Sequence, residues 1–218
     1  MFCDLHTHSV FSDGTYTPTE LIEAAEKMGL SAVALTDHNT TGGLKEFLSA
    51  AAGKPWHAVA GVEFSTDWGD TELHILGLFL PPESFPLVEE RVTELKRNKE
   101  ASNRELCARL TAGGYAVDLD EIKKSTPTGH INRAHIAAAL TEKGYTPSIK
   151  EAFRTLLKKG GEFYTEPKRL PALETVRFIK QIGAVAVLAH PFLNLDEAGL
   201  CGFLEKAVPA GLDGMETR

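Results

Sequence analysis

The alternation of apolar and polar positions along the chain predicts an α/β protein. Two uninterrupted apolar runs, residues 32–36 and 184–189, are typical of strands buried on both faces of a sheet. Segments with apolar side chains every three or four residues, the period of a helix, lie between predicted strands. We predict strands at 2–8, 32–36, 57–64, 73–80, 184–189 and 212–216, and helices at 18–28, 44–52, 173–182 and 196–207. Their order is the βαβ alternation that builds parallel sheets and barrels.

The middle of the chain has a different pattern. We predict no strand between Leu80 and Gly160, and the apolar spacing there is helical. The predicted helices are 86–112, 119–124, 132–143 and 148–159. A helical insertion is the simplest explanation. We therefore predict a barrel formed by residues 1–98 and 165–218, with an insertion of residues 99–164 that covers the active site.

Composition and charge narrow the function classes. The chain has 218 residues, of which 43% are hydrophobic, so it can bury a full core as one domain with an insertion. Its net charge of −7 argues against non-specific coating of nucleic acid. Residues 121–169, however, carry ten Lys or Arg and five Asp or Glu. This basic segment forms either one wall of a phosphate-binding pocket or solvated helix faces.

Targeting and redox signals predict a cytoplasmic protein. Cys3, Cys107 and Cys201 are far apart and lack the spacing of a redox or zinc motif, so we expect reduced, buried thiols. No basic segment followed by an apolar run opens the sequence, and no apolar run is long enough to cross a bilayer. We expect no membrane partner.

Histidine and carboxylate side chains recur where the predicted strands end. His6 and His8 share one face of the first strand, because side chains alternate along a strand. The candidate metal ligands are His6, His8, Asp13, His38, Glu63, His74 and His190. Reactive groups of parallel barrels gather at the carboxyl ends of the strands. We therefore predict two or three divalent ions, with Glu63 as a bridging ligand. These ligand types accept Mn, Zn or Fe.

A cluster of this kind predicts a reaction class. Bound divalent ions make a hydroxide nucleophile from water at neutral pH. They also neutralise the oxygens of a phosphoryl group during displacement. The expected activity is metal-assisted phosphoester hydrolysis.

The ordered motifs resemble those of the PHP (polymerase and histidinol phosphatase) superfamily. They are His6-Thr7-His8, Ser12-Asp13-Gly14, Leu35-Thr36-Asp37-His38, Gly61-Val62-Glu63 and Ala189-His190-Pro191. The resemblance implies a distorted (β/α)7 TIM-like barrel with a trinuclear metal site. Residues 132–137 are similar to the Arg-Pro-His-Ile-Ala pattern of one subgroup, with Ala134 in place of the proline. That subgroup comprises nucleoside 3′,5′-bisphosphate phosphatases and 5′–3′ exoribonucleases.

The resemblance also implies roles for individual residues. One ion would be held by His6, His8 and Glu63, a second by Glu63, His74 and His190, and a third by Asp13 and His38. The catalytic residues would be His6, His8, Glu63, His74 and His190. Arg133 and His135 would grip a substrate phosphate, for which the planar guanidinium is well suited. His130 is either a further phosphate contact or part of a surface loop.

One departure from the family pattern affects the expected activity. The family has a late Asp-x-His motif, and none follows His190 in this sequence. The resemblance therefore implies a C-terminally incomplete barrel, with the first and third metal sites each short of one ligand.

Three functions compete. The first is hydrolysis of nucleoside 3′,5′-bisphosphates or of short RNA from the 5′ end. The second is a histidinol-phosphate-type phosphatase acting on a non-nucleotide substrate. The third is a binding module without catalytic activity. The first two predict a small phosphorylated partner, and none predicts binding of duplex DNA.

Overall fold

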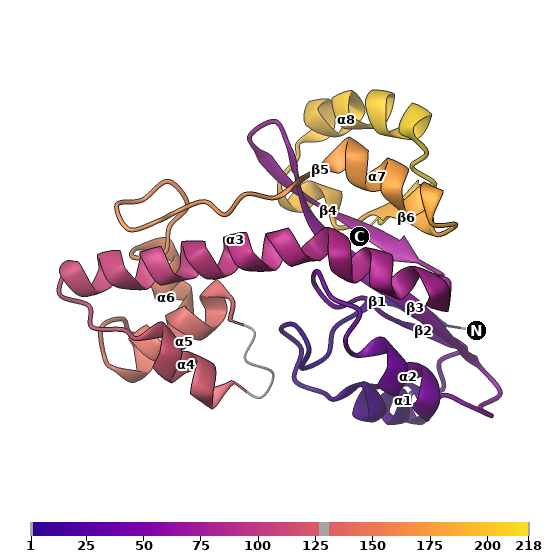
Figure 1. The fold of residues 1–218 in the computed structure, drawn as a ribbon, viewed down its shortest axis with the longest axis horizontal. Coiled ribbons are helices and arrows are strands. Elements are labelled where there is room, and N and C mark those ends of the chain that lie inside the picture. Colours follow the sequence, from indigo (N-terminus) through magenta and orange to yellow (C-terminus); the bar gives the residue numbers. More distant parts are fainter. Residues whose placement is uncertain (1, 127–130, 218) are drawn as a thin grey trace. The chain divides into compact units, whose positions relative to one another are not determined.

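The computed structural model describes residues 2–126 and 131–217, and the chain divides into two compact units (Figure 1). The sheet unit comprises Met1–Thr93 and Arg169–Arg218, and the helical unit comprises Glu94–Lys168. Both predicted boundaries, 98/99 and 164/165, fall within the helical unit. Each unit has its own core, as follows.

A seven-stranded curled sheet forms the centre of the sheet unit. Its strands are β1 (Cys3–Thr7), β2 (Ala32–Leu35), β3 (His57–Trp68), β4 (Thr71–Leu78), β5 (Leu170–Pro171), β6 (Val185–Leu188) and β7 (Gly214–Met215). The order is β1-β2-β3-β4-β6-β7, and β5 pairs with β3. Neighbours are parallel except at β3–β4 and β4–β6, which are antiparallel.

The antiparallel pairs correct the predicted βαβ alternation. Strand β3 does not end near Glu63 but continues to Trp68, and a tight turn at Gly69 and Asp70 leads directly into β4. Gly69 has φ +59°, the left-handed conformation that short hairpin loops require. No helix separates these two strands, so β4 runs opposite to β3.

Helices cover the sheet. They are α1 (Pro18–Lys27), α2 (Leu44–Ala50), α7 (Ala172–Gln181) and α8 (Glu197–Ala210), with short 3-10 turns η1 (Pro82–Ser84) and η2 (Pro191–Leu193). Helix α1 begins with a capping box, in which Thr17 and Glu20 each accept a backbone N–H of the other. The fully buried side chains include Phe47 of α2, Phe64 of β3 and Phe203 of α8. These apolar contacts hold the helices on the sheet.

The helical unit has a separate core. Helix α3 (Phe85–Ala112) begins in the sheet unit, and α4 (Leu119–Ser125), α5 (Arg133–Glu142) and α6 (Ile149–Arg154) follow it. Leu110, Ile136 and Leu140 are completely buried together with Leu157. Helix α6 ends five residues earlier than predicted, because the chain turns at Thr155 and buries Leu157 in this core. No strand occurs in the described part of the helical unit.

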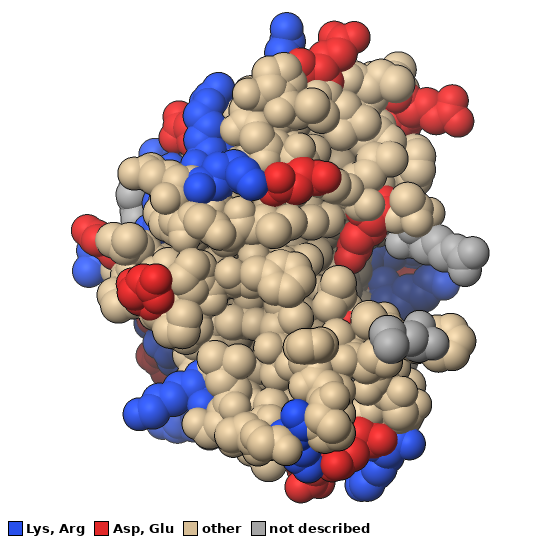
Figure 2. All heavy atoms as spheres, turned by 90° about the vertical axis from the view of Figure 1, so that its right-hand side faces the viewer, with Lys and Arg blue, Asp and Glu red and all other residues tan. Residues whose placement is uncertain are grey.

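The exposure of the cysteines and the distribution of surface charge can be compared with the sequence predictions. Cys107 is buried as expected, but Cys3 and Cys201 are exposed, which corrects the prediction of three buried thiols. Acidic and basic side chains are intermixed among the described residues of the face in Figure 2, rather than forming a patch of one sign. Within the described residues, none of the helices combines the length and apolar character needed to span a bilayer.

Candidate metal centre

Five histidines surround the carboxylate of Glu63, whose side chain is 1% exposed. Oxygen Oε1 lies 2.8 Å from His74 Nδ1 and 3.0 Å from His190 Nε2. Oxygen Oε2 lies 3.2 Å from His6 Nε2, 3.3 Å from His8 Nε2 and 3.0 Å from His38 Nδ1. One carboxylate therefore separates two groups of imidazoles.

The sheet brings these side chains to one edge. His6 lies in β1 and His8 directly after it, while His38 follows β2 and forms a parallel bridge with Glu63. His190 follows β6. These positions agree with the rule that parallel strands present reactive groups at their carboxyl ends.

His74 reaches the same edge by a different route. It lies within β4, where it pairs with Ser65 of β3, rather than at the end of a parallel strand. Because β4 is antiparallel to β6, the middle of β4 lies beside the end of β6, and the Ala189 N–H donates to the His74 carbonyl at 3.0 Å. The reversal of β4 thus places His74 beside His190.

A short loop after β1 carries His8 and Asp13. The buried carboxylate of Asp37 accepts hydrogen bonds from the Ser9 N–H (2.7 Å), the Ser9 hydroxyl (2.6 Å) and the Ser12 hydroxyl (2.7 Å). Asp37 therefore holds in place the loop that carries His8 and Asp13.

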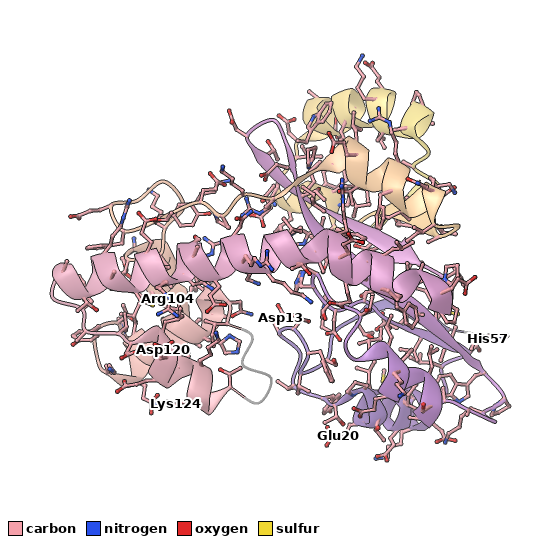
Figure 3. The ribbon with its side chains drawn as sticks, in the orientation of Figure 1. Asp13, Glu20, His57, Arg104, Asp120 and Lys124 are labelled. Carbon is pink, nitrogen blue, oxygen red and sulfur yellow. The ribbon has the colours of Figure 1, made fainter. Side chains whose placement is uncertain are left out.

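Asp13 and His57 lie at different distances from the cluster. Asp13 lies at its rim, with its side chain 41% exposed and its oxygens 3.8 Å from His8 Nδ1 and 3.6 Å from His38 Nε2 (Figure 3). His57 is exposed at the opposite end of β3 and takes no part in the cluster.

The electrostatics of the cluster are dominated by Glu63. Burial raises the pKa of Glu63, but the close histidines, His190 first, outweigh burial and hold that pKa below its usual range. Burial likewise lowers the pKa of His6 and His74, yet their carboxylate neighbours raise it to about 10 and about 9. A buried anion therefore favours positive charge on the groups around it.

The donor set fits divalent metal ions. Glu63 Oε2 and His38 Nδ1 are buried and, among the described residues, neither makes a well-aligned hydrogen bond. Two triads have ligand atoms that all lie within 4.8 Å of one another, namely His6, Glu63 and His190, and His8, His38 and Glu63. Imidazole and carboxylate donors at this spacing suit Zn, Mn or Fe.

The proposed phosphate ligands lie in the helical unit, at the start of α5. Asn132 caps this helix by accepting the N–H groups of Ala134 (3.0 Å) and His135 (3.2 Å). The Arg133 guanidinium lies 5.1 Å from the ring centroid of Tyr164 and 5.9 Å from that of Phe153. The third predicted phosphate contact, His130, lies outside the described residues.

The basic segment pairs with acidic groups of its own unit. Lys123 Nζ lies 2.8 Å from Glu100 Oε1, and Lys159 Nζ lies 2.9 Å from Glu166 Oε1. The guanidinium of Arg154 donates to both carboxylate oxygens of Glu151. These pairs favour solvated helix faces over a continuous basic wall.

Sequence reasoning missed two groups that contact the cluster. Glu216, which follows β7, lies 2.8 Å from His6 Nδ1 and accepts the His190 N–H at 2.6 Å. Glu72 lies 3.4 Å from His74 Nε2 and also accepts from Arg169, whose side chain is 5% exposed. The strand-end rule that indicated His190 applies equally to Glu216. Nothing in the sequence pattern indicated Glu72.

An α/β sheet with a His/Glu cluster at one edge defines a class of metal-binding enzymes. The sequence matches the PHP domain family over residues 4–169, and the chain belongs to this family. It is 34% identical to the 3′,5′-nucleoside bisphosphate phosphatase of Chromobacterium violaceum over 86% of this chain. It is 31% identical to the 5′-3′ exoribonuclease Rnm of Escherichia coli, also over 86% of this chain.

The comparison with solved structures agrees with the comparison of sequences. An amidohydrolase from Chromobacterium violaceum, solved with bound sulfate and no metal, superposes with a TM-score of 0.89 at 31% identity. That match covers 99% of this chain and 76% of the other. The chain spans less than two thirds of the phosphatase and of the exoribonuclease, since the matches cover 66% and 64% of their lengths.

Proposed function

We propose that this chain is a metal-dependent phosphoesterase whose ions are held around Glu63. The observation that supports this most directly is the position of Glu63, with two imidazole nitrogens at Oε1 and three at Oε2. A carboxylate with imidazoles on both oxygens is suited to bridge two ions. Such ions supply a hydroxide nucleophile and neutralise phosphoryl oxygens.

The two close triads pair His6 with His190 and His8 with His38, which differs from the implied ion sets, so we propose those sets as one division of a shared cluster. His6 and His8 face Oε2 and would complete one set with Glu63. His74 and His190 face Oε1 and would complete the second. Asp13 and His38, whose Oδ2 and Nε2 atoms lie 3.6 Å apart, would hold the third ion at the exposed rim. We propose two to three divalent ions on this basis.

We propose that the substrate is a small phosphorylated nucleotide, either a nucleoside 3′,5′-bisphosphate or the 5′ end of a short RNA. The names of the two relatives support this substrate class. The start of α5 supports only the phosphate part of this substrate, because a helix N-terminus favours an anion and Arg133 offers paired donors. His135 Nδ1 accepts the Asn132 N–H at 3.1 Å, so Nε2 carries the proton of the neutral ring.

A substrate panel tests this function. The purified chain would be incubated with adenosine 3′,5′-bisphosphate, a short 5′-phosphorylated RNA or histidinol phosphate, each with Mn²⁺, Zn²⁺ or EDTA. Release of inorganic phosphate would be measured for the two phosphomonoesters, and release of nucleoside monophosphates for the RNA. We expect turnover of the nucleotide substrates with metal and none with EDTA. Turnover of histidinol phosphate alone would support the non-nucleotide phosphatase instead. Metal binding without any turnover would support the binding module.

A further inference from the structure

The carboxylate of Glu216 joins two of the proposed metal ligands that come from distant parts of the sequence. Oxygen Oε1 lies 2.8 Å from His6 Nδ1, and Oε2 accepts the His190 N–H at 2.6 Å. His6 belongs to β1, the first strand of the order, and His190 follows β6, the strand next to the last. Glu216 itself is anchored to β6, since its N–H donates to the Leu188 carbonyl at 2.9 Å.

The contact with His6 determines how that ring faces Glu63. A carboxylate only accepts hydrogen bonds, so His6 Nδ1 must carry the proton that points at Glu216. The other ring nitrogen, Nε2, lies 3.2 Å from Glu63 Oε2, on the side where the ligand atoms gather. Once its own proton is displaced, Nε2 is the nitrogen that presents a lone pair to a metal ion.

The contact with His190 holds an unfavourable backbone conformation. His190 has φ +28° and ψ +59°, in a region that residues other than glycine rarely adopt. The hydrogen bond to Glu216, together with Pro191 directly after it, fixes this turn. The turn directs the His190 ring so that Nε2 reaches Glu63 Oε1 at 3.0 Å.

We propose that Glu216 is a positioning residue of the metal centre: one carboxylate sets the ring orientation of His6 and the backbone turn of His190. This role rests on the proposed metal site but not on the identity of the substrate. Partners of this kind, bonded to the far nitrogen of a ligating histidine, typically change metal affinity 10–100-fold when removed.

The sharpest variant is Glu216→Gln, which keeps the size of the side chain. Glu216 accepts two N–H donors, one on each oxygen, whereas an amide accepts at only one end and donates at the other. Either His6 or the His190 N–H then faces an NH2 group. Glu205→Gln is the matched control, because Glu205 is exposed on α8.

The test measures zinc affinity by competition with a chelator. In the zinc-loaded protein, 15N NMR determines which ring nitrogen of each histidine binds zinc and which carries a proton. In the wild type we expect His6 to bind zinc through Nε2 and to carry a proton on Nδ1. We expect Glu216→Gln to weaken zinc binding by roughly 10–100-fold, with Glu205→Gln unchanged. Melting curves confirm that each variant is folded.

Several results would overturn the proposal. One is equal zinc affinity in Glu216→Gln and the wild type. Another is binding of zinc through His6 Nδ1 in the wild type, a result that does not depend on folding of the variant. A wild type that binds no zinc would overturn the metal site and this role with it. Zinc binding without phosphoester hydrolysis would overturn the proposed function and leave the affinity comparison to decide the role of Glu216.

Discussion

Burial of Glu63 with an ionised carboxylate is possible because five imidazoles contact its two oxygens. A buried charge without such neighbours would cost several kcal/mol of folding free energy. Glu216 and Glu63 raise the pKa of His6 to about 10, and Glu63 and Glu72 raise that of His74 to about 9, against the opposing effect of burial. The residues proposed to bind metal are thus also mutually stabilising.

The substrate role of Arg133 predicts a defined kinetic change. Replacing Arg133 by Ala removes paired donors for a phosphate, so we expect KM to rise by about 10-fold or more, corresponding to roughly 1.5–3 kcal/mol for a charged hydrogen bond. Steady-state kinetics and metal analysis would measure this. Arg154→Ala, which removes an exposed Arg of the same unit, is the control. Loss of bound metal in Arg133→Ala would contradict the assignment.

Thiol reactivity provides a test that does not depend on function. Burial, with a smaller contribution from Asp118, raises the pKa of Cys107 to about 11, so this thiol stays protonated at pH 8. Cys3 and Cys201 are exposed. We expect a thiol reagent to modify two cysteines in the native protein at pH 8 and three after denaturation. Rapid modification of all three in the native state would be inconsistent with the buried position of Cys107.

At the scale of single elements, the loop after β1 has little tolerance for change. A Cβ atom on Gly14 would lie 2.2 Å from the His8 carbonyl oxygen and 2.8 Å from the Ser9 nitrogen. Both atoms belong to the backbone and cannot rotate away. Glycine is therefore required at this position for the loop to bring His8 and Asp13 to the cluster.

Gly14→Ala should both destabilise the protein and weaken metal binding. By analogy with overpacked cores we expect a loss of about 1–3 kcal/mol in the free energy of unfolding. Gly202→Ala is the matched control, because nothing lies within 4 Å of its added methyl group on α8, where Ala is favoured over Gly by roughly 0.5–1 kcal/mol. Denaturant melts measure the free energy of unfolding of both variants. Equal stability of Gly14→Ala and the wild type would refute the close contact.

The sequence predicted the position of most strands and helices, because burial on both faces gives apolar runs at 32–36 and 184–189. It did not predict strand direction. An apolar run reads the same in a parallel and an antiparallel pair, so the β3–β4 hairpin was missed although Gly69-Asp70 marks its turn. The two-residue strand β5 is too short to give a pattern.

The candidate site followed from the sequence more completely than the sheet did. His6, His8, His38 and His190 lie at or near strand ends that chain order already indicates, whereas Glu63 was predicted at a strand end and lies within β3. Convergence of His74 depends on the reversal of β4, which the apolar pattern does not encode. The contacts made by Glu216 and Glu72 depend on side-chain geometry across the sheet, which only the three-dimensional structure supplies.

At the scale of the whole molecule, the two units have separate cores and separate proposed tasks. The sheet unit carries the proposed metal ligands, and the helical unit carries Arg133 and His135, the proposed phosphate ligands. A defect in one core should therefore affect one task more than the other.

Leu140→Ala tests this division, because Leu140 is completely buried in the core of the helical unit. Loss of a buried leucine typically costs about 2–5 kcal/mol. We expect weaker substrate binding, seen as a higher KM, with the zinc content of the wild type. The variant Ala138→Gly, at an exposed position of the same helix, controls for a general effect on α5. Loss of zinc in Leu140→Ala would argue against separate tasks.

The central claim is that Glu63 assembles the metal ions that drive phosphoester hydrolysis. The most direct measurement is the number of zinc ions bound per chain, determined in parallel for the wild type and Glu63→Gln. Melting curves confirm that both proteins are folded. We expect two to three ions in the wild type and at most one, weakly held, in Glu63→Gln. The same number of tightly bound ions in both proteins would contradict it.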